Sequence, residues 1–143
     1  MGGAQSACAV ARGLGKVGDA WSMLVLRDVA RGIARFDQLR ISLGIAPNIL
    51  SQRLRSLVDA GILERRRYME RPPRDEYVLT DAGRDFLPVL YAIAEWGRRH
   101  HGEGGVTRLR SASGNLVEPA VIDRLTGQEL AGQILELVDP DDA

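Results

Sequence analysis

The apolar residues of the first hundred positions recur mostly at the three- and four-residue spacing of amphipathic helices. The runs are bounded by residues that begin or end helices. Asp19 or Ser22 is a candidate N-cap, and Pro47 suits a first helical turn. Gly44 and Gly61 suit the position just past a last turn. The pattern therefore predicts five helices, over residues 8–17, 21–30, 36–43, 47–60 and about 81–101.

Two extended runs, residues 62–70 and 76–80, separate the fourth and fifth predicted helices. Pro72 and Pro73 lie between the runs, and proline is tolerated at a turn or strand edge but not inside a sheet. We therefore predict a hairpin with the two prolines at its tip. Alternation places arginines on both faces of the first arm, so neither face is cleanly apolar. The hairpin is expected to project as a ribbon.

The fourth predicted helix has two different faces. Leucines recur on one face, and the opposite face carries Asn48, Ser51, Gln52 and Arg55. Most polar stripes are simply solvated, but these four residues include none of the acids and lysines that usually fill such faces. Asn, Gln and Arg are the side chains that form two hydrogen bonds with a base edge in the DNA major groove. The stripe is therefore a candidate DNA-reading surface.

The 143-residue chain has 19 basic and 19 acidic side chains, so its formal net charge is zero. The charges are unevenly placed. Residues 1–110 carry 18 basic and 12 acidic groups, a difference of +6, and residues 111–143 carry 1 and 7, a difference of −6. Arginines concentrate between residues 31 and 74, which favours a negatively charged partner. Charges on a ribbon also prevent edge-to-edge pairing, but that role does not require an excess of one sign.

Three helices, a recognition-like helix and a basic ribbon follow the order of a winged helix-turn-helix, a mainly α fold with a small β wing (α+β). In that architecture one helix enters the major groove, and the ribbon reaches the neighbouring backbone or minor groove. We predict a DNA-binding and dimerisation domain over residues 1–101 and an acidic C-terminal extension over residues 102–143. The candidate DNA contacts are Arg35, Arg40, Asn48, Ser51, Gln52, Arg55, Arg71 and Arg74.

Two other classes of function compete with a sequence-specific regulator that binds double-stranded DNA. A winged-helix module for protein–protein contacts is the stronger rival, because the fold also serves without DNA. An enzyme is the weaker one, since the sequence has no glycine-rich phosphate loop, metal-ligand set or recognisable nucleophile motif. No run reaches the roughly 20 apolar residues of a membrane-spanning helix, and no secretory signal pattern is present. We therefore expect a cytoplasmic protein that does not contact a membrane.

The helix predicted over residues 81–101 is apolar on more than one stripe, including Phe86, Ile93 and Trp96. A helix that is apolar on so much of its circumference must bury two sides. We expect the second side to meet another copy of the chain and so to form a homodimer. The segment after Gly102 is an alternative cover for that side. A small apolar effector between the subunits is a further hypothesis.

Several short motifs appear in a fixed order along the chain. They are Trp21 with Leu26 and Arg27; Arg35 with Phe36; Pro47 with Leu50, Ser51, Arg53 and Leu54; Pro72, Pro73, Arg74, Glu76 and Tyr77; and Leu79, Thr80 and Gly83. Through them, residues 8–101 closely resemble the HxlR-type transcriptional regulators, relatives of the MarR group. The resemblance implies a dimeric winged-helix DNA-binding protein paired through its terminal helices. We expect a repressor.

Two positions depart from the pattern of the HxlR-type regulators. Ala46 stands where the family commonly has serine, so the side-chain cap of the recognition helix is missing, at a cost of about 1 kcal/mol. Asp75 stands where the family tends to have an apolar residue. That substitution makes the packing of the ribbon's return strand uncertain.

Cys8 is the only cysteine, which excludes an internal disulfide. A lone buried cysteine is most often inert packing. Some HxlR-like regulators, however, resemble this chain in having a cysteine just before the first helix, where it senses oxidants or electrophiles. A helix N-terminus favours the reactive thiolate. Both interpretations of Cys8, inert packing and redox sensor, stay open.

The C-terminal extension has apolar runs at residues 116–122 and 134–138, and the first of these predicts a strand. Its "SG" and "DRLTG" segments faintly resemble a zinc-ribbon extension of some family members. Asp123 and Thr126, however, stand where cysteines would be needed. The adjacent histidines that end the last predicted helix point in two directions rather than at one metal. We therefore expect no metal and no cofactor.

Overall fold

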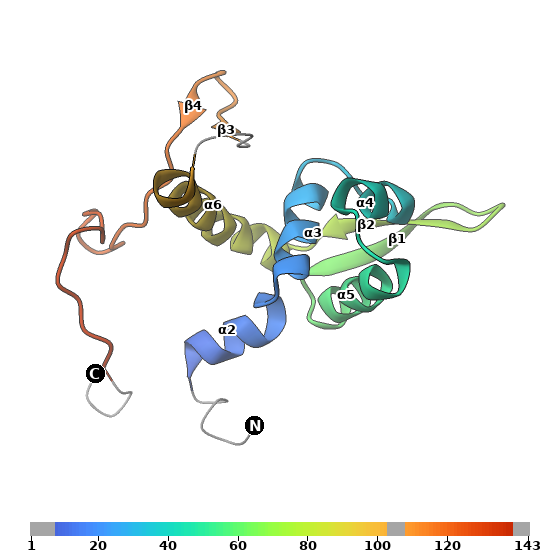
Figure 1. Cartoon of the computed structure of the whole chain (residues 1–143), viewed down its shortest axis with the longest axis horizontal. Helices are drawn as coiled ribbons and strands as arrows, with labels where there is room; N and C mark the ends of the chain where they lie inside the picture. Colours follow the sequence, from blue (N-terminus) through green and yellow to red (C-terminus); the bar gives the residue numbers. More distant parts are fainter. Residues whose placement is uncertain (1–7, 103–107, 139–143) are drawn as a thin grey trace. The chain divides into compact units, whose positions relative to one another are not determined.

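The computed structural model describes residues 8–102 and 108–138 (Figure 1). The chain divides into two compact units, which meet between Leu90 and Tyr91 inside one long helix. The predicted domain boundary between residues 101 and 102 stays a prediction. The elements are, in chain order, α2 (Ala9–Val17), α3 (Ala20–Ala30), α4 (Phe36–Leu43), α5 (Pro47–Asp59), β1 (Leu63–Met69), β2 (Arg74–Leu79), α6 (Asp81–His101), β3 (Leu109–Arg110) and β4 (Leu116–Val117).

The first unit is a winged helix-turn-helix. Helices α3, α4 and α5 are followed by the antiparallel ribbon of β1 and β2, which extends beyond α4 and α5 in Figure 1. All five helices that the apolar spacing predicts are present, and their ends agree to within one or two residues. The predicted fold class, mainly α with a small β wing, is confirmed.

The helix ends lie where the capping residues predict them. Asp19 is the N-cap of α3, because its carboxylate accepts hydrogen bonds from the Ser22 amide at 2.8 Å and the Ser22 hydroxyl at 2.6 Å. Gly44 and Gly61 follow α4 and α5 with φ angles of +61° and +72°. Only glycine adopts that left-handed conformation without steric cost, so each glycine stops its helix cleanly.

The core of the first unit lies between α3, α4, α5 and the base of β1. The buried apolar side chains are Val17, Val25, Leu26, Val29, Leu39, Ile45, Leu50, Leu54, Leu57 and Leu63. On α5 the three buried leucines are the members of the predicted apolar stripe, spaced by four and three residues. Full burial of one leucine side chain is worth about 1.5–3 kcal/mol, so this cluster supplies most of what holds the three helices together.

One carboxylate lies inside this core. Asp28 on α3 is 0% exposed, and its oxygens accept hydrogen bonds from the Arg27 guanidinium at 2.8 Å and from the Ser42 hydroxyl at 2.7 Å. Arg31 lies 3.5 Å from the same carboxylate. A buried charge is tolerated only when it is paired and hydrogen-bonded. The Ser42 bond therefore ties α4 to α3 at a fixed position.

The ribbon is more irregular than the sequence predicts, and its return strand begins earlier. The return strand was expected to begin at residue 76, but β2 begins at Arg74. Leu63 pairs with Leu79 at the base and Arg67 pairs with Asp75 farther out. The register then shifts between Arg67 and Met69, which leaves Tyr68 as the extra residue of a bulge. Leu63 at the base is the one buried residue of the two strands, so neither face of the ribbon is cleanly buried, as expected.

Thr80 joins the ribbon to α6. Its hydroxyl donates to the carbonyl oxygens of Gly61 at 2.6 Å and Ile62 at 3.1 Å, and it accepts a hydrogen bond from the Gly83 amide. Gly83 is buried in the first turn of α6, where an added Cβ would lie 2.3 Å from the Ile62 carbonyl oxygen. The start of α6 is thereby fixed against the segment between α5 and β1.

The second unit contains the last part of α6 and the segment that follows it. Strands β3 and β4 form a two-residue ladder, and the predicted strand over residues 116–122 is present only as Leu116–Val117. Pro119 lacks an amide donor, which helps to end the strand. Only Ile122 pairs again, as an isolated bridge with Glu129. The apolar run at residues 134–138 has no regular structure and is exposed.

None of the helices in the described part of the chain is long and apolar enough to cross a membrane.

Candidate nucleic-acid interface

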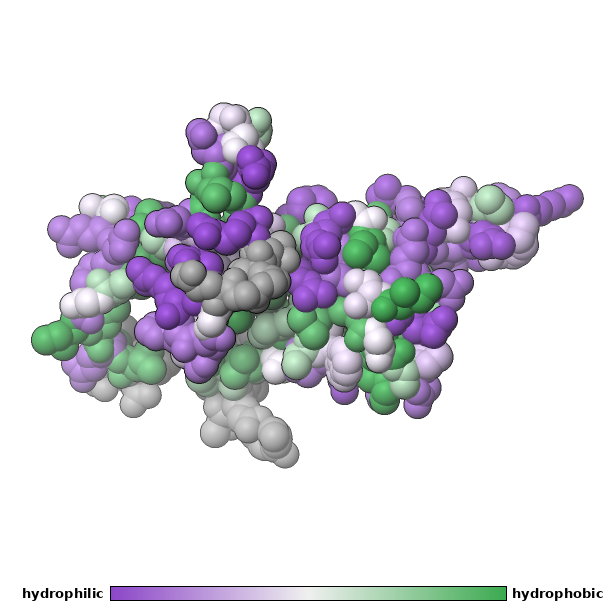
Figure 2. Space-filling view, turned by 45° about the horizontal axis from the view of Figure 1, so that its top comes forward, coloured by the Kyte–Doolittle hydropathy of each residue, from purple (hydrophilic) through white to green (hydrophobic). Residues whose placement is uncertain are grey.

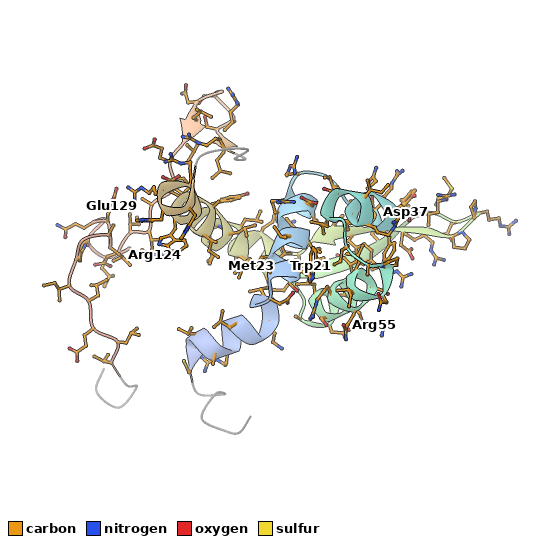
Figure 3. All side chains as sticks on the ribbon, in the orientation of Figure 1. Trp21, Met23, Asp37, Arg55, Arg124 and Glu129 are labelled. Carbon is orange, nitrogen blue, oxygen red and sulfur yellow. The ribbon has the colours of Figure 1, made fainter. Side chains whose placement is uncertain are left out.

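The polar stripe of α5 lies at the surface of the first unit. Asn48, Ser51, Gln52 and Arg55 are all exposed, and the leucines on the other face of the helix are buried. Figure 3 shows the Arg55 side chain at the outer margin of α5. The orientation follows from helical spacing, because residues three or four apart share a face. The amphipathic orientation predicted for this helix is confirmed, and the role of each side chain in DNA contact stays a prediction.

The start of α5 has no side-chain cap. Ala46 occupies the N-cap position, Pro47 begins the helix, and the first turn contains no acid. The missing cap was predicted from the sequence and is confirmed. Free amide groups and the positive end of the helix dipole together make such a helix start suited to a phosphate group. The first turn of α5 therefore has the chemistry to accept a phosphate group, and its contact with DNA stays a prediction.

The ribbon carries its charge at the surface. Arg71 and Arg74 are exposed at the tip, on either side of the two prolines. Figure 2 shows that the projecting end of the first unit is mostly hydrophilic. Polar and basic groups at the end of a ribbon are accessible to a backbone or a groove next to the one that a recognition helix occupies.

The ion pairs divide the arginines of the first unit from Arg27 onward into two groups. One group is paired: Arg27 and Arg31 with Asp28, Arg53 with Asp19, Arg65 and Arg67 with Asp75, Arg66 with Glu64, and Arg84 with Asp81. The other group has no carboxylate partner among the described residues, and it consists of Arg35, Arg40, Arg55, Arg71 and Arg74. These five are the arginines that the sequence selects as candidate DNA contacts.

Arg35 and Arg40 lie on either end of α4. Arg35 is the residue before the helix, and its backbone bridges to Glu76 of β2. The Arg35 guanidinium lies 4.2 Å from the centroid of the Tyr68 ring, within the range of a cation–π contact. Arg40 is half-buried in the last turn of α4. Arg35 thus lies beside the ribbon. Arg40 lies at the other end of α4.

A hollow of about 330 Å³ opens between the start of α4 and the ribbon. It is lined by Arg35, Phe36, Asp37, Gln38, Tyr68, Arg74 and Asp75. The sequence selects Arg35 and Arg74 as DNA contacts and marks Asp75 only as a departure from the family pattern, and it misses Tyr68, which does not stand out in the spacing. The cross-strand register, which places Asp75 opposite Arg67, is the signal that identifies Asp75.

Asp75 is the best-connected acid of the ribbon. Its carboxylate accepts hydrogen bonds from Arg65 Nε at 2.8 Å and from Arg67 Nε at 3.2 Å, and Arg65 Nη2 lies at 2.6 Å. The hydrogen bond from Arg65 is the main reason that the pKa of Asp75 lies below its ordinary value. The same hydrogen bond raises the pKa of Arg65. The return strand therefore holds its charged residue by ion pairs rather than by apolar packing.

Cys8 is exposed and occupies the N-cap position of α2. It is therefore not a core residue of the part of the chain that the structure describes. The Cys8 side chain makes no capping hydrogen bond. Its reactivity stays a prediction.

The described residues contain no group of three or more His, Cys, Asp or Glu side chains that could hold a metal ion. The His100 and His101 rings lie 5.6 Å and 4.8 Å from the Trp96 ring, centroid to centroid. In the extension, Asp123 accepts hydrogen bonds from the Leu125 amide and the Thr126 hydroxyl, both at 2.9 Å. Where a zinc ribbon would place cysteines, this turn is closed by hydrogen bonds.

The fold and the exposed surface define a winged helix-turn-helix protein of the DNA-binding, MarR-like type. A family model for the HxlR-like helix-turn-helix matches residues 16–104. The chain is 38% identical over 127 residues to Rv3095, an uncharacterised HTH-type transcriptional regulator of Mycobacterium tuberculosis, and the match covers 87% of this chain and 80% of that protein. The chain belongs to the HxlR-like helix-turn-helix family and is a transcriptional regulator, so the resemblance seen in the sequence is confirmed.

Solved structures agree with this assignment. The crystal structure of PA1607, a candidate transcription factor, superimposes with a TM-score of 0.78 at 38% identity and covers 94% of this chain and 96% of its own. The redox regulator HypR in its oxidised form superimposes with a TM-score of 0.61 at 33% identity, over 66% of this chain and 98% of its own. The likeness to PA1607 thus includes most of the C-terminal extension, and the likeness to HypR covers a smaller share of the chain.

Proposed function

We propose that this regulator binds double-stranded DNA as a homodimer and represses transcription from a specific operator. Helix α5 would lie in the major groove and read base edges through Asn48, Ser51, Gln52 and Arg55. The tip of the ribbon, with Arg71 and Arg74, would contact the adjoining backbone or minor groove. The observation that carries the proposal is the division of arginines, because those left without a carboxylate lie on α4, α5 and the ribbon tip.

The ribbon tip and the polar stripe of α5 would make different kinds of contact with DNA. Arginine contacts with phosphates supply affinity that does not depend on sequence, whereas bidentate contacts with base edges discriminate by about 1–3 kcal/mol each. The uncapped start of α5 supports this geometry, because a phosphate would satisfy amides that Ala46 leaves free. Arg35 and Arg40 would add backbone contacts from α4.

The homodimer is supported by apolar side chains that a single chain leaves exposed. On α6 these are Val89, Ile93 and Trp96, and on α2 they are Val10 and Leu14. Large exposed apolar side chains that recur on one helix mark an interaction site. In this proposal a second copy covers them. Sedimentation of the Ile93→Glu variant, with Leu116→Glu as the exposed control, is expected to show a monomer for the first and a dimer for the second.

A thiol switch is the proposed form of control, and a small apolar effector bound between the subunits is the other form. Cys8 is exposed at the start of α2, and the relative HypR is a redox regulator with an oxidised and a reduced form. Treatment with diamide or a quinone is expected to release wild-type protein from its operator and to leave Cys8→Ala bound. Equal release of both proteins would remove Cys8 from the proposal.

The decisive experiment compares two arginines of the interface. Genomic fragments retained by the purified protein define the operator, and fluorescence anisotropy then measures binding to that duplex and to a scrambled duplex. Arg55→Ala is expected to lose about 1–3 kcal/mol of preference for the operator. Arg71→Ala is expected to weaken both duplexes alike and to lower the salt slope by about 1.

Arg124→Ala is the matched control, because it removes an exposed arginine from the C-terminal unit (Figure 3). It is expected to change neither preference nor salt slope. If the affinity for the duplexes changes neither with salt nor in either interface variant, a module for protein contacts is favoured instead. The zero net charge allows that alternative.

A further inference from the structure

Part of the positive charge of the ribbon is paired with an acid of the ribbon itself. Arg65 and Arg67 lie on one face of β1, and the Asp75 carboxylate lies between them on β2, with only 15% of its side chain exposed. Each guanidinium donates to it through Nε, at 2.8 Å for Arg65 and 3.2 Å for Arg67. Arg67 also lies 3.8 Å from Glu70. Both guanidinium groups are thus paired with acids of the ribbon, unlike those at its tip, although 61% of the Arg65 side chain and 47% of the Arg67 side chain are exposed.

The strand register builds this arrangement. Arg67 pairs directly with Asp75 across the ladder, and Arg65 lies two residues earlier on the same face. Directly opposed and diagonal side chains on one face of an antiparallel pair are close enough to interact. The bulge that follows Arg67 interrupts the regular pairing, so Asp75 is the acid that the strand register places opposite these two arginines.

The Asp75 carboxylate would compete with a DNA phosphate for Arg65 and Arg67. A phosphate that approaches Arg65 must compete with an oxygen already 2.6 Å from its Nη2. It must also approach a negative charge, and like charges repel at this distance. Asp75 offsets one of the two positive charges and orients the Nε donors of both arginines inward. Arg71 and Arg74 have no such competitor among the described residues.

We propose that Asp75 is a specificity-determining residue, because it withholds Arg65 and Arg67 from the DNA backbone and so limits binding to DNA of any sequence. The inference rests on the proposed function. Phosphate contacts position a protein without carrying sequence information, and the ratio of specific to non-specific affinity decides how well a regulator finds its site. Fewer phosphate contacts from the ribbon leave a larger share of the affinity to the base contacts of α5.

The test measures binding to poly(dI–dC), a duplex that contains no operator, over a range of salt. Asp75→Asn keeps the size of the side chain and removes its charge, so both arginines lose their ion pair with Asp75, and Arg67 keeps only the exposed Glu70 at 3.8 Å. Two added phosphate contacts are expected to steepen the slope of log affinity against log salt by about 2. Between about 50 and 200 mM salt, the loss of affinity should then exceed that of wild type by roughly tenfold. Asp75→Ala is the second variant, in case asparagine retains a hydrogen bond to one arginine.

Asp37→Asn is the matched control. Asp37 lines the same hollow at the start of α4 (Figure 3), and it has no arginine partner among the described residues. The substitution removes the same charge without releasing an arginine, so the salt slope is expected to stay at the wild-type value. A second control introduces Asp75→Asn together with Arg65→Gln and Arg67→Gln. With no arginines to release, this variant should also keep the wild-type slope, and circular dichroism confirms that each variant is folded.

The outcomes separate this inference from the function on which it rests. If Arg71→Ala weakens binding but neither Asp75 variant steepens the slope, Asp75 has no such role and the proposed function stands. If the Asp75 variants bind poly(dI–dC) more weakly, the carboxylate orients the arginines toward DNA, and the inference is overturned. If wild-type protein binds no duplex in a salt-dependent way, both the inference and the proposed function fail.

Discussion

The two units of this chain are ordered by different physical means. In the described part of the first unit, ten apolar side chains contributed by the segment from α2 to β1 are buried together. In the second unit, none of the described residues from Tyr91 onward is buried, and local hydrogen bonds such as those of Asp123 close its turns. Burial couples many residues at once, whereas a turn couples only its own few. Substitutions in the first unit should therefore change the free energy of unfolding more, and affect more residues, than substitutions in the second unit.

The largest difference is expected for apolar truncations. Leu54 is 1% exposed in the core, so Leu54→Ala should lower the free energy of unfolding by about 2–5 kcal/mol through lost burial and a cavity. Ile134 is 104% exposed in the second unit, and Ile134→Ala should change it by less than about 0.5 kcal/mol. Urea unfolding followed by circular dichroism measures both. Comparable losses would mean that the second unit has a buried core after all.

A smaller difference is expected within α6, which passes from one unit into the other. Gly83 is buried, and an added Cβ would lie 2.3 Å from the Ile62 carbonyl oxygen and 3.0 Å from a Leu79 methyl. Gly83→Ala should therefore cost about 1–3 kcal/mol by overpacking. Gly97 has nothing within 4 Å of an added Cβ, so Gly97→Ala should stabilise the helix by about 0.5–1 kcal/mol. Thermal melting distinguishes the two, and equal signs would contradict the described contact.

The smallest effects are expected from acid, and they compare one aspartate from each unit. Burial raises the pKa of Asp19, but hydrogen bonds from Ser22 and the charge of Arg53 more than offset this, so the net shift is downward. The Leu125 amide and the Thr126 hydroxyl lower the pKa of Asp123. A lowered pKa stabilises the folded form above the unfolded value of about 4, and this stabilisation is lost as pH falls through the folded value.

Amide shifts of Ser22 and Leu125 measured against pH report these two sites. Both are expected to titrate below the ordinary aspartate range. In Asp123→Ala the Leu125 amide should lose its acid transition while that of Ser22 stays. A shared transition at both amides would show that the two turns unfold together, and the units would then not be independent.

Much of the fold was predictable because local signals and burial agree in the first unit. Asp19, Gly44, Pro47 and Gly61 end or begin helices through their own backbone and side-chain chemistry, and the leucine spacing of α5 leaves one choice of buried face. The apolar run at residues 116–122 misled for the opposite reason. A strand needs a partner as well as apolar residues, and among the described residues only Leu109–Arg110 form a ladder with this run.

The candidate interface was predictable only in part. Helical periodicity places the polar stripe of α5 on the surface, because that rule needs no tertiary contact. The pairing of Asp75 with Arg65 depends on strand register and on a bulge at Tyr68, and the spacing of residues in the sequence predicts neither of them. The contact between Arg35 and Tyr68 joins residues from separate elements, so only the folded arrangement reveals it.

Thr80 has a consequence for the geometry of an assembled regulator. Its hydroxyl fastens the first turn of α6 to the residues that immediately follow α5. In the proposed homodimer, the pairing of α6 with its counterpart would therefore also set the distance and angle between two recognition helices. Operator half-site spacing would then depend on the three hydrogen bonds of one threonine side chain.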